Sequence, residues 1–302
     1  MSRDADWQHG YMFDLRRKAR LKLQRAMSEV VAESDRRSRE LTENQHDQTL
    51  AELSATNQEL ARVLSELSDA RMEISDVQQR LGELEQQARR DITQALDVRA
   101  TNEAAAFVLE HMPKAPVFWN PQDTLRYGLS QVEVEGLALE FGVASGTTLR
   151  IIVEQLKDAE HEVFGFDVFS GLPQTWRTGF PAGEFAQENL PQVRGAQLVP
   201  GLFEDTLSGF LEKHPGPVSF VHLDADLYSS TKSVLDRIER RLVAGTVIVF
   251  DEFFNFPGWQ EHEYRAWAEF VDRTGVGFEY LSYTANHEQV VVRITAPASP
   301  PA

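Results

Sequence analysis

The sequence contains no cysteine among its 302 residues. Disulfide bonds, thiolate metal ligands and a cysteine nucleophile are therefore excluded. No apolar run approaches the roughly 20 residues that a membrane-spanning helix needs. Residues 1–14 also lack the apolar stretch of a signal peptide. These absences lead us to expect a cytoplasmic protein, and a hydrophobic content of 42% is sufficient for a packed core.

Basic side chains are scarce in the second part of the chain. Residues 101–302 carry 14 Lys and Arg against 28 Asp and Glu, whereas residues 1–100 carry 16 against 19. Binding to a phosphate backbone needs positive charge, so we expect no nucleic-acid partner. The acidic balance suits a cation or a neutral or basic small molecule, or it serves only solubility.

Residues 1–45 form a polar segment that we expect to be helical. Within it, residues 15–25 carry six positive charges beside a short aromatic cluster at residues 7–13. Such a basic segment either contacts an anionic membrane surface peripherally or is a solvated helix that leads into the next segment, and we favour the solvated helix.

Glycine and proline are scarce in residues 46–98, where two apolar series run in parallel. The first series is Leu53, Leu60, Leu67, Ile74, Leu81 and Ala88, and the second is Thr56, Val63, Ala70, Val77 and Leu84. Alternating spacings of three and four residues over about five heptads predict a coiled coil. Because a lone helix with so narrow an apolar stripe is poorly stable, it needs a partner. The simplest partner is another copy of the chain, and folding back onto residues 15–45 is the alternative.

From residue 99 to residue 295, short apolar runs alternate with helical patterns. We expect strands at residues 136–141, 163–166, about 196–199, 218–223 and 246–250, which is typical of a parallel sheet covered on both faces. Two further strands, at residues 277–283 and 289–294, have a short link that suits an antiparallel hairpin. The sequence thus predicts a Rossmann-like α/β domain with seven strands. Residues 296–302, rich in Pro and Ala, are expected to be a disordered tail.

The stretch of residues 139–146 joins the first strand of this domain to a helix through a glycine turn. One strand later, Asp167 follows the apolar residues 163–166. A strand, a glycine turn and an acid at the end of the next strand are typical of a nucleotide pocket. Without the full three-glycine spacing, the same pattern also fits an α/β turn that binds no ligand.

Acidic residues follow the later strands. Glu204 and Asp205 come after the third strand, Asp224 and Asp226 after the fourth, and Asp251 and Glu252 after the fifth. Because the ends of parallel strands meet at one edge of a sheet, the four acids of the last two strands converge there. A hard divalent cation such as Mg²⁺ would neutralise them. Alternatively, one carboxyl group is held protonated as an acid or base, or Asp226 and Glu252 cap helices and face water.

Two histidines stand close to these acids in the sequence. His222 lies two residues before Asp224 in a strand and is either a packed core imidazole or a contact on the ligand or metal side. His262 lies in a loop just beyond the metal candidates, where it is a candidate acid, base or substrate contact.

Several stretches together resemble the macrocin O-methyltransferase family of class I S-adenosylmethionine (SAM) methyltransferases. They are residues 139–146, 165–173 with Trp176, 201–207, 222–231 and 251–264. The resemblance covers about residues 100–295 and leaves out the heptad segment. It implies a Mg²⁺-dependent transfer of a methyl group from SAM to a hydroxyl, often of a sugar on a natural product.

The resemblance also implies roles for individual residues. Expected contacts to SAM are Glu140, Gly142, Ser145, Gly146, Asp167, Glu204, Asp205 and Asp224. The expected metal ligands are Asp224, Asp251 and Glu252, of which Glu252 replaces the Asp that many members carry. Asp226, Asp224 and His262 are the expected catalytic residues, with Asp226 as the base or a further ligand.

The sequence therefore predicts a SAM- and Mg²⁺-dependent O-methyltransferase that acts on a small-molecule or glycan hydroxyl and forms a homo-oligomer. The alternatives are a coiled-coil scaffolding protein with an inactive methyltransferase-like domain, or another enzyme that reuses the SAM fold.

Overall fold

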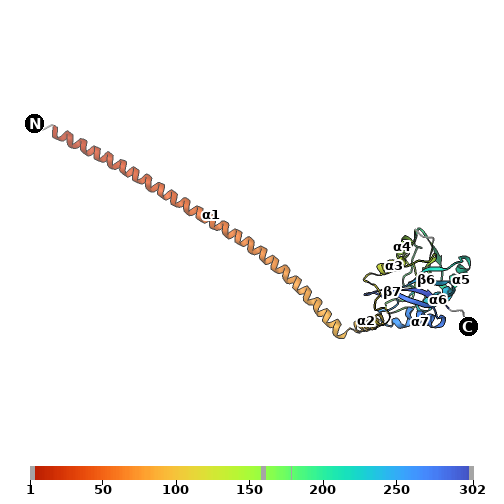
Figure 1. Cartoon of the computed structure of the whole chain (residues 1–302). Coiled ribbons are helices and arrows are strands. Elements are labelled where there is room, and N and C mark those ends of the chain that lie inside the picture. The colour runs from red at the N-terminus through yellow and green to blue at the C-terminus, as the bar shows by residue number, and fades with distance from the viewer. Residues whose placement is uncertain (1–3, 158–160, 178, 299–302) are drawn as a thin grey trace. The chain divides into compact units, whose positions relative to one another are not determined.

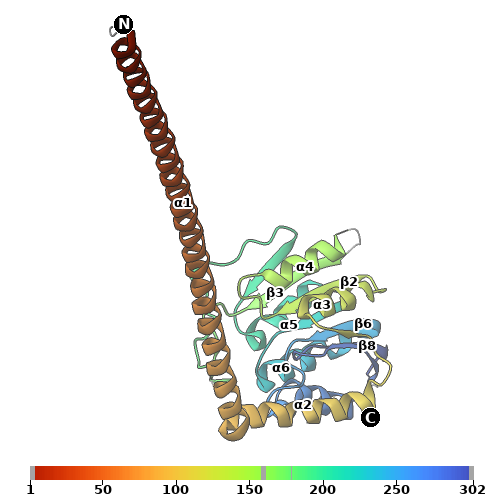
Figure 2. The ribbon, with the colours of Figure 1, turned by 90° about the vertical axis from the view of Figure 1, so that its left-hand side faces the viewer.

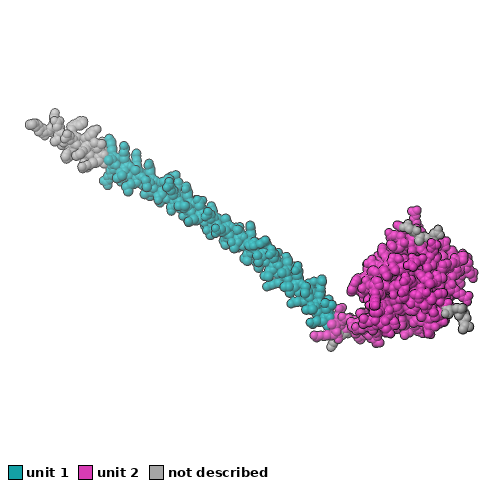
Figure 3. All heavy atoms as spheres, viewed as in Figure 1, with its two compact units in different colours: residues 1–86 teal, residues 87–302 magenta. Residues whose placement is uncertain are grey.

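The computed structural model describes residues 4–157, 161–177 and 179–298, without the side chains of residues 4–16 and of Arg90. The chain divides into two compact units, residues 1–86 and residues 87–302 (Figure 3).

The first unit is formed by a single long helix, α1, which runs from Asp4 to Arg90 and includes the first residues of the second unit (Figure 1). Every side chain described in it, over residues 17–89, is exposed. Because residues 15–45 and 46–98 share this continuous helix up to Arg90, folding of one segment back onto the other is excluded. No helix among the described residues has the length and apolarity needed to cross a membrane. The predicted aromatic cluster lies outside the described side chains, and a membrane contact stays a prediction.

A second helix, α2 (Ile92–His111), starts the fold of the second unit. Asp91 caps it, since its Oδ1 accepts hydrogen bonds from the backbone N–H groups of Thr93 (2.9 Å) and Gln94 (3.3 Å). Three side chains of α2 are buried in the core of this unit: Ala100, Ala104 and Phe107. Residues 92–99 of the same helix are exposed.

One eight-stranded sheet forms the centre of the second unit (Figure 1). Its strands are β1 (Val117–Phe118), β2 (Gly136–Phe141), β3 (His161–Asp167), β4 (Ala196–Pro200), β5 (Val218–Leu223), β6 (Leu242–Phe250), β7 (Gly277–Thr284) and β8 (Val290–Ala296). They lie in the order β1-β7-β8-β6-β5-β2-β3-β4. All neighbouring strands are parallel except the pairs β6–β8 and β7–β8.

All seven strands predicted from the sequence are present, and the α/β class is confirmed. The predicted count was wrong by one strand, because the sequence did not indicate β1, which is two residues long and pairs with β7. The hairpin β7–β8 is antiparallel as expected, and its second strand inserts next to β6. Of the predicted tail, Ala296 ends β8, and residues 299–302 lie outside the described residues.

Helices cover both faces of the sheet (Figure 2). The first face packs against α2, α5 (Phe203–Lys213), α6 (Tyr228–Ile238) and α7 (Glu263–Thr274), and the second against α3 (Pro121–Ser130) and α4 (Thr147–Leu156). Two short 3₁₀ helices, η1 (Glu239–Arg241) and η2 (Trp259–Glu261), complete the unit. With helices on both sides, the central strands are buried on both faces, which explains why residues 218–223 are all buried.

The strand order reverses at β2. From β2 the chain moves outward to β3 and β4, and it then returns to β5 on the other side of β2. In open α/β sheets ligands bind beyond the carboxyl ends of the strands at such a reversal.

Candidate functional site

Three loops meet beyond the carboxyl ends of β2, β5 and β6, because backbone hydrogen bonds continue past the strands. The N–H of Gly142 donates to the carbonyl of Phe166 (2.9 Å), and the N–H of Asp224 donates to that of Phe141 (2.9 Å). The N–H of Asp251 donates to the carbonyl of Leu223 (2.8 Å). The first residue of each loop is therefore fixed next to its neighbour.

The glycine turn after β2 is held by Asp167. One carboxylate oxygen of Asp167 accepts hydrogen bonds from the backbone N–H groups of Val143 (2.9 Å) and Ala144 (2.8 Å). Gly142 has φ 93°, and a Cβ at this position would lie 1.8 Å from the carbonyl oxygen of Asp224. Only glycine fits here, so the turn and the loop after β5 approach each other closely.

A cavity of about 550 Å³ opens beside this turn. This volume is within the range of small-molecule sites. Its lining combines the turn, the loop after β3, the start of α5, the loop after β5 and the start of α6. Of the predicted site residues, it is lined by Gly142, Asp167, Glu204, Asp224, Asp226 and Glu252.

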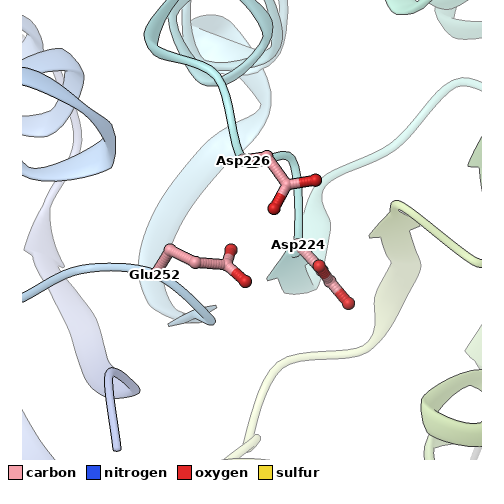
Figure 4. A group of neighbouring side chains, drawn as sticks. All are labelled: Asp224, Asp226 and Glu252. Atoms are coloured by element: carbon pink, nitrogen blue, oxygen red, sulfur yellow. The ribbon is translucent and has the colours of Figure 1, made fainter. Parts of the chain in front are cut away.

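Three acids form a cluster at the edge of the cavity (Figure 4). Asp224 and Asp226 come from the loop after β5 and Glu252 from the loop after β6, and one oxygen of each lies within 4.8 Å of the others. Burial and the neighbouring Asp251 raise the pKa of Asp226 to about 7. Burial and the surrounding carboxylates also hold the pKa values of Asp224 and Glu252 well above their usual range.

Several residues around the cavity have a left-handed backbone although they are not glycine. Ala144 has φ 42°, Phe169 55°, Asp226 57° and Asn255 67°. They lie in the loops after β2, β3, β5 and β6. Residues with an L side chain rarely adopt this conformation, and it concentrates where function requires a fixed geometry.

Asp251, a predicted metal ligand, is not part of the acid cluster and lies beside the buried His222. Its Oδ1 is 3.7 Å from Nε2 of His222, whose Nδ1 lies 3.0 Å from Oε1 of Glu140. Although burial lowers the pKa of His222, the carboxylates of Asp251 and Glu140 raise it well above its usual range. His222 is therefore buried in the core, as one of the two sequence interpretations expected, with its ring nitrogens directed at two carboxyl groups.

Glu140, a predicted contact of SAM, is fully buried beneath the turn and does not line the cavity. Its second oxygen, Oε2, has no hydrogen-bond partner within the described part of the chain. Burial raises the pKa of Glu140 despite the contact to His222.

Glu263, at the start of α7, supports the acid cluster through hydrogen bonds to neighbouring residues. Its Oε2 accepts a hydrogen bond from the backbone N–H of Glu252 (3.0 Å), and its Oε1 accepts one from the hydroxyl of Thr231 (3.4 Å). It also accepts from the backbone N–H of Ala225. One buried side chain thus connects the loops after β5 and β6.

Two replacements of Glu263 distinguish the effect of its hydrogen bonds from the effect of its charge. Burial holds the pKa of Glu263 well above its usual range, which favours the neutral carboxyl group. We expect Glu263→Gln to change the free energy of unfolding by less than about 0.5 kcal/mol, because the amide oxygen still accepts from Glu252 and the amide nitrogen can donate to the hydroxyl of Thr231. Glu263→Leu leaves the N–H of Glu252 unpaired and should cost about 1–3 kcal/mol. Urea unfolding checks both values, and equal losses in the two variants would refute this bracing role.

Aromatic rings form the outer wall of the cavity around Arg177. The guanidinium of Arg177 lies 3.9 Å from the ring centroid of Trp176 and 4.6 Å from that of Phe256. Its Nη1 is 3.0 Å from Oε1 of Glu288 in the β7–β8 turn. Stacking and ion pairing together hold the loop after β3 over the cavity. Arg177 is the one basic residue among those lining the cavity in the described part of the chain.

Six of the predicted site residues do not line the cavity: Glu140, Ser145, Gly146, Asp205, Asp251 and His262. Ser145 and Asp205 are exposed, whereas Gly146 is buried against Pro191 and Val193. His262 is half-buried against Phe256 and Trp176, with ring centroids 5.5 and 6.5 Å away. Burial, and then Arg177, lower the pKa of His262, so its imidazole is neutral at pH 7.

Arg177, Glu263 and Glu288 were not predicted as site residues from the sequence. Arg177 directly follows Trp176 in a stretch that was already singled out, and its position beside an aromatic residue was an available signal. Glu263 and Glu288 carry no local signal, because their partners lie in other loops.

The sequence of residues 139–253 matches a protein-family model described as a methyltransferase domain. The resemblance to methyltransferases inferred from the motifs is thereby confirmed for this stretch. It includes the glycine turn, Asp167 and the acid cluster.

One curated relative is 8-demethyl-8-(2,3-dimethoxy-α-L-rhamnosyl)-tetracenomycin-C 4′-O-methyltransferase of Streptomyces olivaceus. It is 26% identical over a stretch that covers 43% of this chain. The chain spans 59% of that relative's length.

Two similar solved structures are those of calicheamicin methyltransferase CalS11 and of the O-methyltransferase NovP. The first has a TM-score of 0.45 and 22% identity, and covers 73% of this chain and 92% of its own. The second has a TM-score of 0.44 and 20% identity, and covers 58% of this chain and 79% of its own.

Proposed function

We propose that this chain is a SAM-dependent O-methyltransferase that methylates a hydroxyl of a small molecule, with a divalent cation at the acid cluster. The observation that carries the proposal is the position of Asp224, Asp226 and Glu252 at the edge of a cavity that the glycine turn bounds. The domain match supplies the reaction class, and this geometry supplies the site for it.

The cavity suits SAM in shape and charge. Gly142 and Ala144 offer close approach to the backbone, and Asp167 and Glu204 offer carboxylates for ribose hydroxyls or the amino group. SAM supplies an electrophilic methyl group on a positively charged sulfur. The acidic lining is therefore complementary to the methyl donor. Four further residues stay predicted contacts of SAM: Glu140, Ser145, Gly146 and Asp205. Of these, Glu140 would act indirectly, by supporting the glycine turn.

The acid cluster fits a hard cation such as Mg²⁺. All its donors are carboxylate oxygens, and Oε2 of Glu252 is buried without a partner among the described residues. Asp224, Asp226 and Glu252 would hold the ion, which when bound lowers the pKa of an acceptor hydroxyl. Asp251 stays a predicted ligand, although its carboxylate faces His222.

The acceptor proton would move to a carboxylate of the cluster. We assign this role to Asp226, whose carboxyl group lines the cavity beside Asp224 and Glu252. Asp224 would keep the hydroxyl in line with the methyl group, because positioning dominates such a transfer. Neutral His262 would contact the acceptor through the loop after β6.

The aromatic wall indicates the class of acceptor. Rings of Trp176, Phe180 and Phe185 border the cavity, and they offer flat apolar surfaces for the C–H face of a sugar. The relative from Streptomyces olivaceus is described as a 4′-O-methyltransferase of a rhamnosyl tetracenomycin. We therefore propose a sugar hydroxyl of a glycosylated natural product or glycan as the acceptor.

Binding of SAM to the full chain tests the proposed activity. Isothermal titration calorimetry should detect SAM binding, and a mixture of rhamnosyl glycosides with methyl-labelled SAM should yield labelled product. S-adenosylhomocysteine should compete with SAM, and adenosine alone serves as the weak control. A chain that binds no SAM would refute the proposed function.

Cation binding should depend on pH in a predictable direction. Because the pKa values of all three acids are raised, protons occupy the cluster near pH 6 and compete with the cation. We expect Mg²⁺ to raise the melting temperature more at pH 8 than at pH 6. Sodium chloride of equal ionic strength is the control for screening. A rise of the same size at both pH values, or with sodium chloride, would contradict cation binding at this site.

A further inference from the structure

We propose that residues 53–88 of α1 form a parallel, in-register coiled coil with a second copy of this chain. The inference is independent of the proposed catalytic function, because it rests only on the first unit and the adjoining end of α1. It specifies both the partner and the direction of the helices.

The apolar stripe of α1 has no cover within the described chain. Its leucines, isoleucine and valines between residues 53 and 84 are 46–63% exposed. All side chains described over residues 17–89 are exposed, and the helix has no break that would let it fold on itself. An isolated helix with such a stripe is not stabilised by packing, so another helix must bury the stripe.

Charges beside the stripe decide the direction of the partner helix. In heptad letters, Leu53, Leu60, Leu67, Ile74 and Leu81 are at a, and Thr56, Val63, Ala70, Val77 and Leu84 are at d. The g positions are then Glu52, Glu59, Glu66, Glu73, Arg80 and Gln87, and the e positions are Asn57, Leu64, Arg71, Gln78 and Glu85.

A parallel, in-register pair brings each g residue next to the e residue five positions later on the partner helix. Glu66 then meets Arg71, and Arg80 meets Glu85, once on each side of the coiled coil. The other g and e positions of this arrangement combine charged with neutral residues, so no like charges face each other. Within its own helix Arg80 also pairs with Asp76, at 3.0 Å.

The antiparallel arrangement is less favourable. It pairs g with g on one side and e with e on the other, and at full overlap of residues 53–84 it brings Glu66 next to Glu73 twice on the g side. These repulsions cancel the attraction between Glu59 and Arg80 that the same arrangement offers. The charge pattern therefore selects the parallel direction, in which both chains leave the coiled coil at the same end.

The absence of cysteine makes this direction directly measurable. In the full chain, Thr56→Cys and Leu84→Cys are made as separate single variants. A residue at d faces its own copy in a parallel, in-register pair, so both variants should form a disulfide-linked dimer under mild oxidation. Gln79→Cys, on the outer face at f, is the matched control and should remain unlinked.

An antiparallel pair gives a different result. There each d residue faces an a residue of the partner, so Thr56 and Leu84 lie far from their own copies and neither cysteine variant would cross-link. That outcome would overturn the proposal. Leucine at a with valine at d also permits coiled coils of three or four parallel helices. The cysteine test reports the direction of the helices whichever number is present.

Light scattering provides the second test. The full chain should have a mass of at least twice the 34.2 kDa of one copy. Leu67→Lys combined with Ile74→Lys should reduce the mass to one copy, because the charges would be buried in the stripe. Ser65→Lys combined with Met72→Lys adds the same charge on the outer face and should leave the mass unchanged. A single-copy mass for the unmodified chain would refute self-association.

Discussion

Replacing Asp226 with asparagine is expected to stop methyl transfer and, at the same time, to stabilise the folded chain. Asparagine keeps the shape of the side chain and tolerates the left-handed backbone, with φ 57°, that Asp226 adopts. It cannot accept the proton of the acceptor hydroxyl, and it is a weaker ligand for a cation. We expect kcat to fall by about 10²–10⁴-fold, the usual contribution of a positioned base.

The gain in stability follows from the raised pKa of Asp226. Between about pH 4 and its folded value of about 7, the unfolded chain releases this proton and the folded chain keeps it. The stability of the folded state therefore falls as the pH rises through this window. Without a cation, Asp226→Asn should recover up to about 4 kcal/mol at pH 8 and little near pH 4.

Thermal unfolding and single-turnover kinetics measure the two effects on the same variant. Asp272→Asn, on the exposed surface of α7, removes one charge elsewhere and should change neither quantity. SAM binding should survive in Asp226→Asn, which separates loss of the base from loss of the pocket. Full activity of this variant would show that Asp226 is neither base nor ligand.

Replacing His222 with leucine is expected to cause the largest loss of stability. The imidazolium lies buried between the carboxylates of Glu140 and Asp251, at 3.0 and 3.7 Å. Its removal leaves Glu140 buried without a partner, which costs about 3–5 kcal/mol for a broken buried ion pair. Because the folded pKa of His222 is raised, its contribution is complete below about pH 6.5 and is lost as the pH rises through the raised value.

A double-mutant cycle identifies the cause of this loss. Glu140→Leu combined with His222→Leu removes both charges, so the pair should cost less than His222→Leu alone. Urea unfolding followed by tryptophan fluorescence reports on this unit, since four of the five tryptophans lie in residues 87–302. Additive losses would mean that the two side chains do not interact.

The sequence was a good guide to the sheet and to the edge where the acids gather. Apolar runs bounded by glycine and acidic residues predicted seven strands, because a strand buried on both faces needs continuous apolar residues. A strand of two residues such as β1 carries no such signal. Its pairing depends on the position of β7, which is more than 150 residues away in the chain.

The identity of the clustered acids could not be predicted from spacing. Asp251 and Glu252 are neighbours in sequence, yet only Glu252 joins Asp224 and Asp226. The side that each one faces depends on the loop backbone and on His222, which attracts Asp251. Likewise, the position of Glu140 near the end of β2 was predicted correctly, but its side chain is fully buried and does not line the cavity.

The loop between β3 and β4 shows the limit of pattern analysis. It has no regular period, and its fold over the cavity depends on Arg177 meeting Glu288 from the β7–β8 turn. Aromatic and basic residues in such a loop can be noted from the sequence. Their partners come from elements more than 75 residues away, so only the folded chain brings them together.

The helix cap at Asp91 determines where a fragment of the chain must begin if it is to fold by itself. Ala100, Ala104 and Phe107 pack into the catalytic fold, and Glu103 accepts a hydrogen bond from Gln260 of η2 at 2.7 Å. A fragment that begins at residue 99 would lack the first two turns of α2 and their cap. A fragment that begins at Gln87 retains the Asp91 cap and the whole of α2. Limited proteolysis near Asp91 should therefore release a catalytic piece that keeps its ligand affinity, and shorter pieces should aggregate.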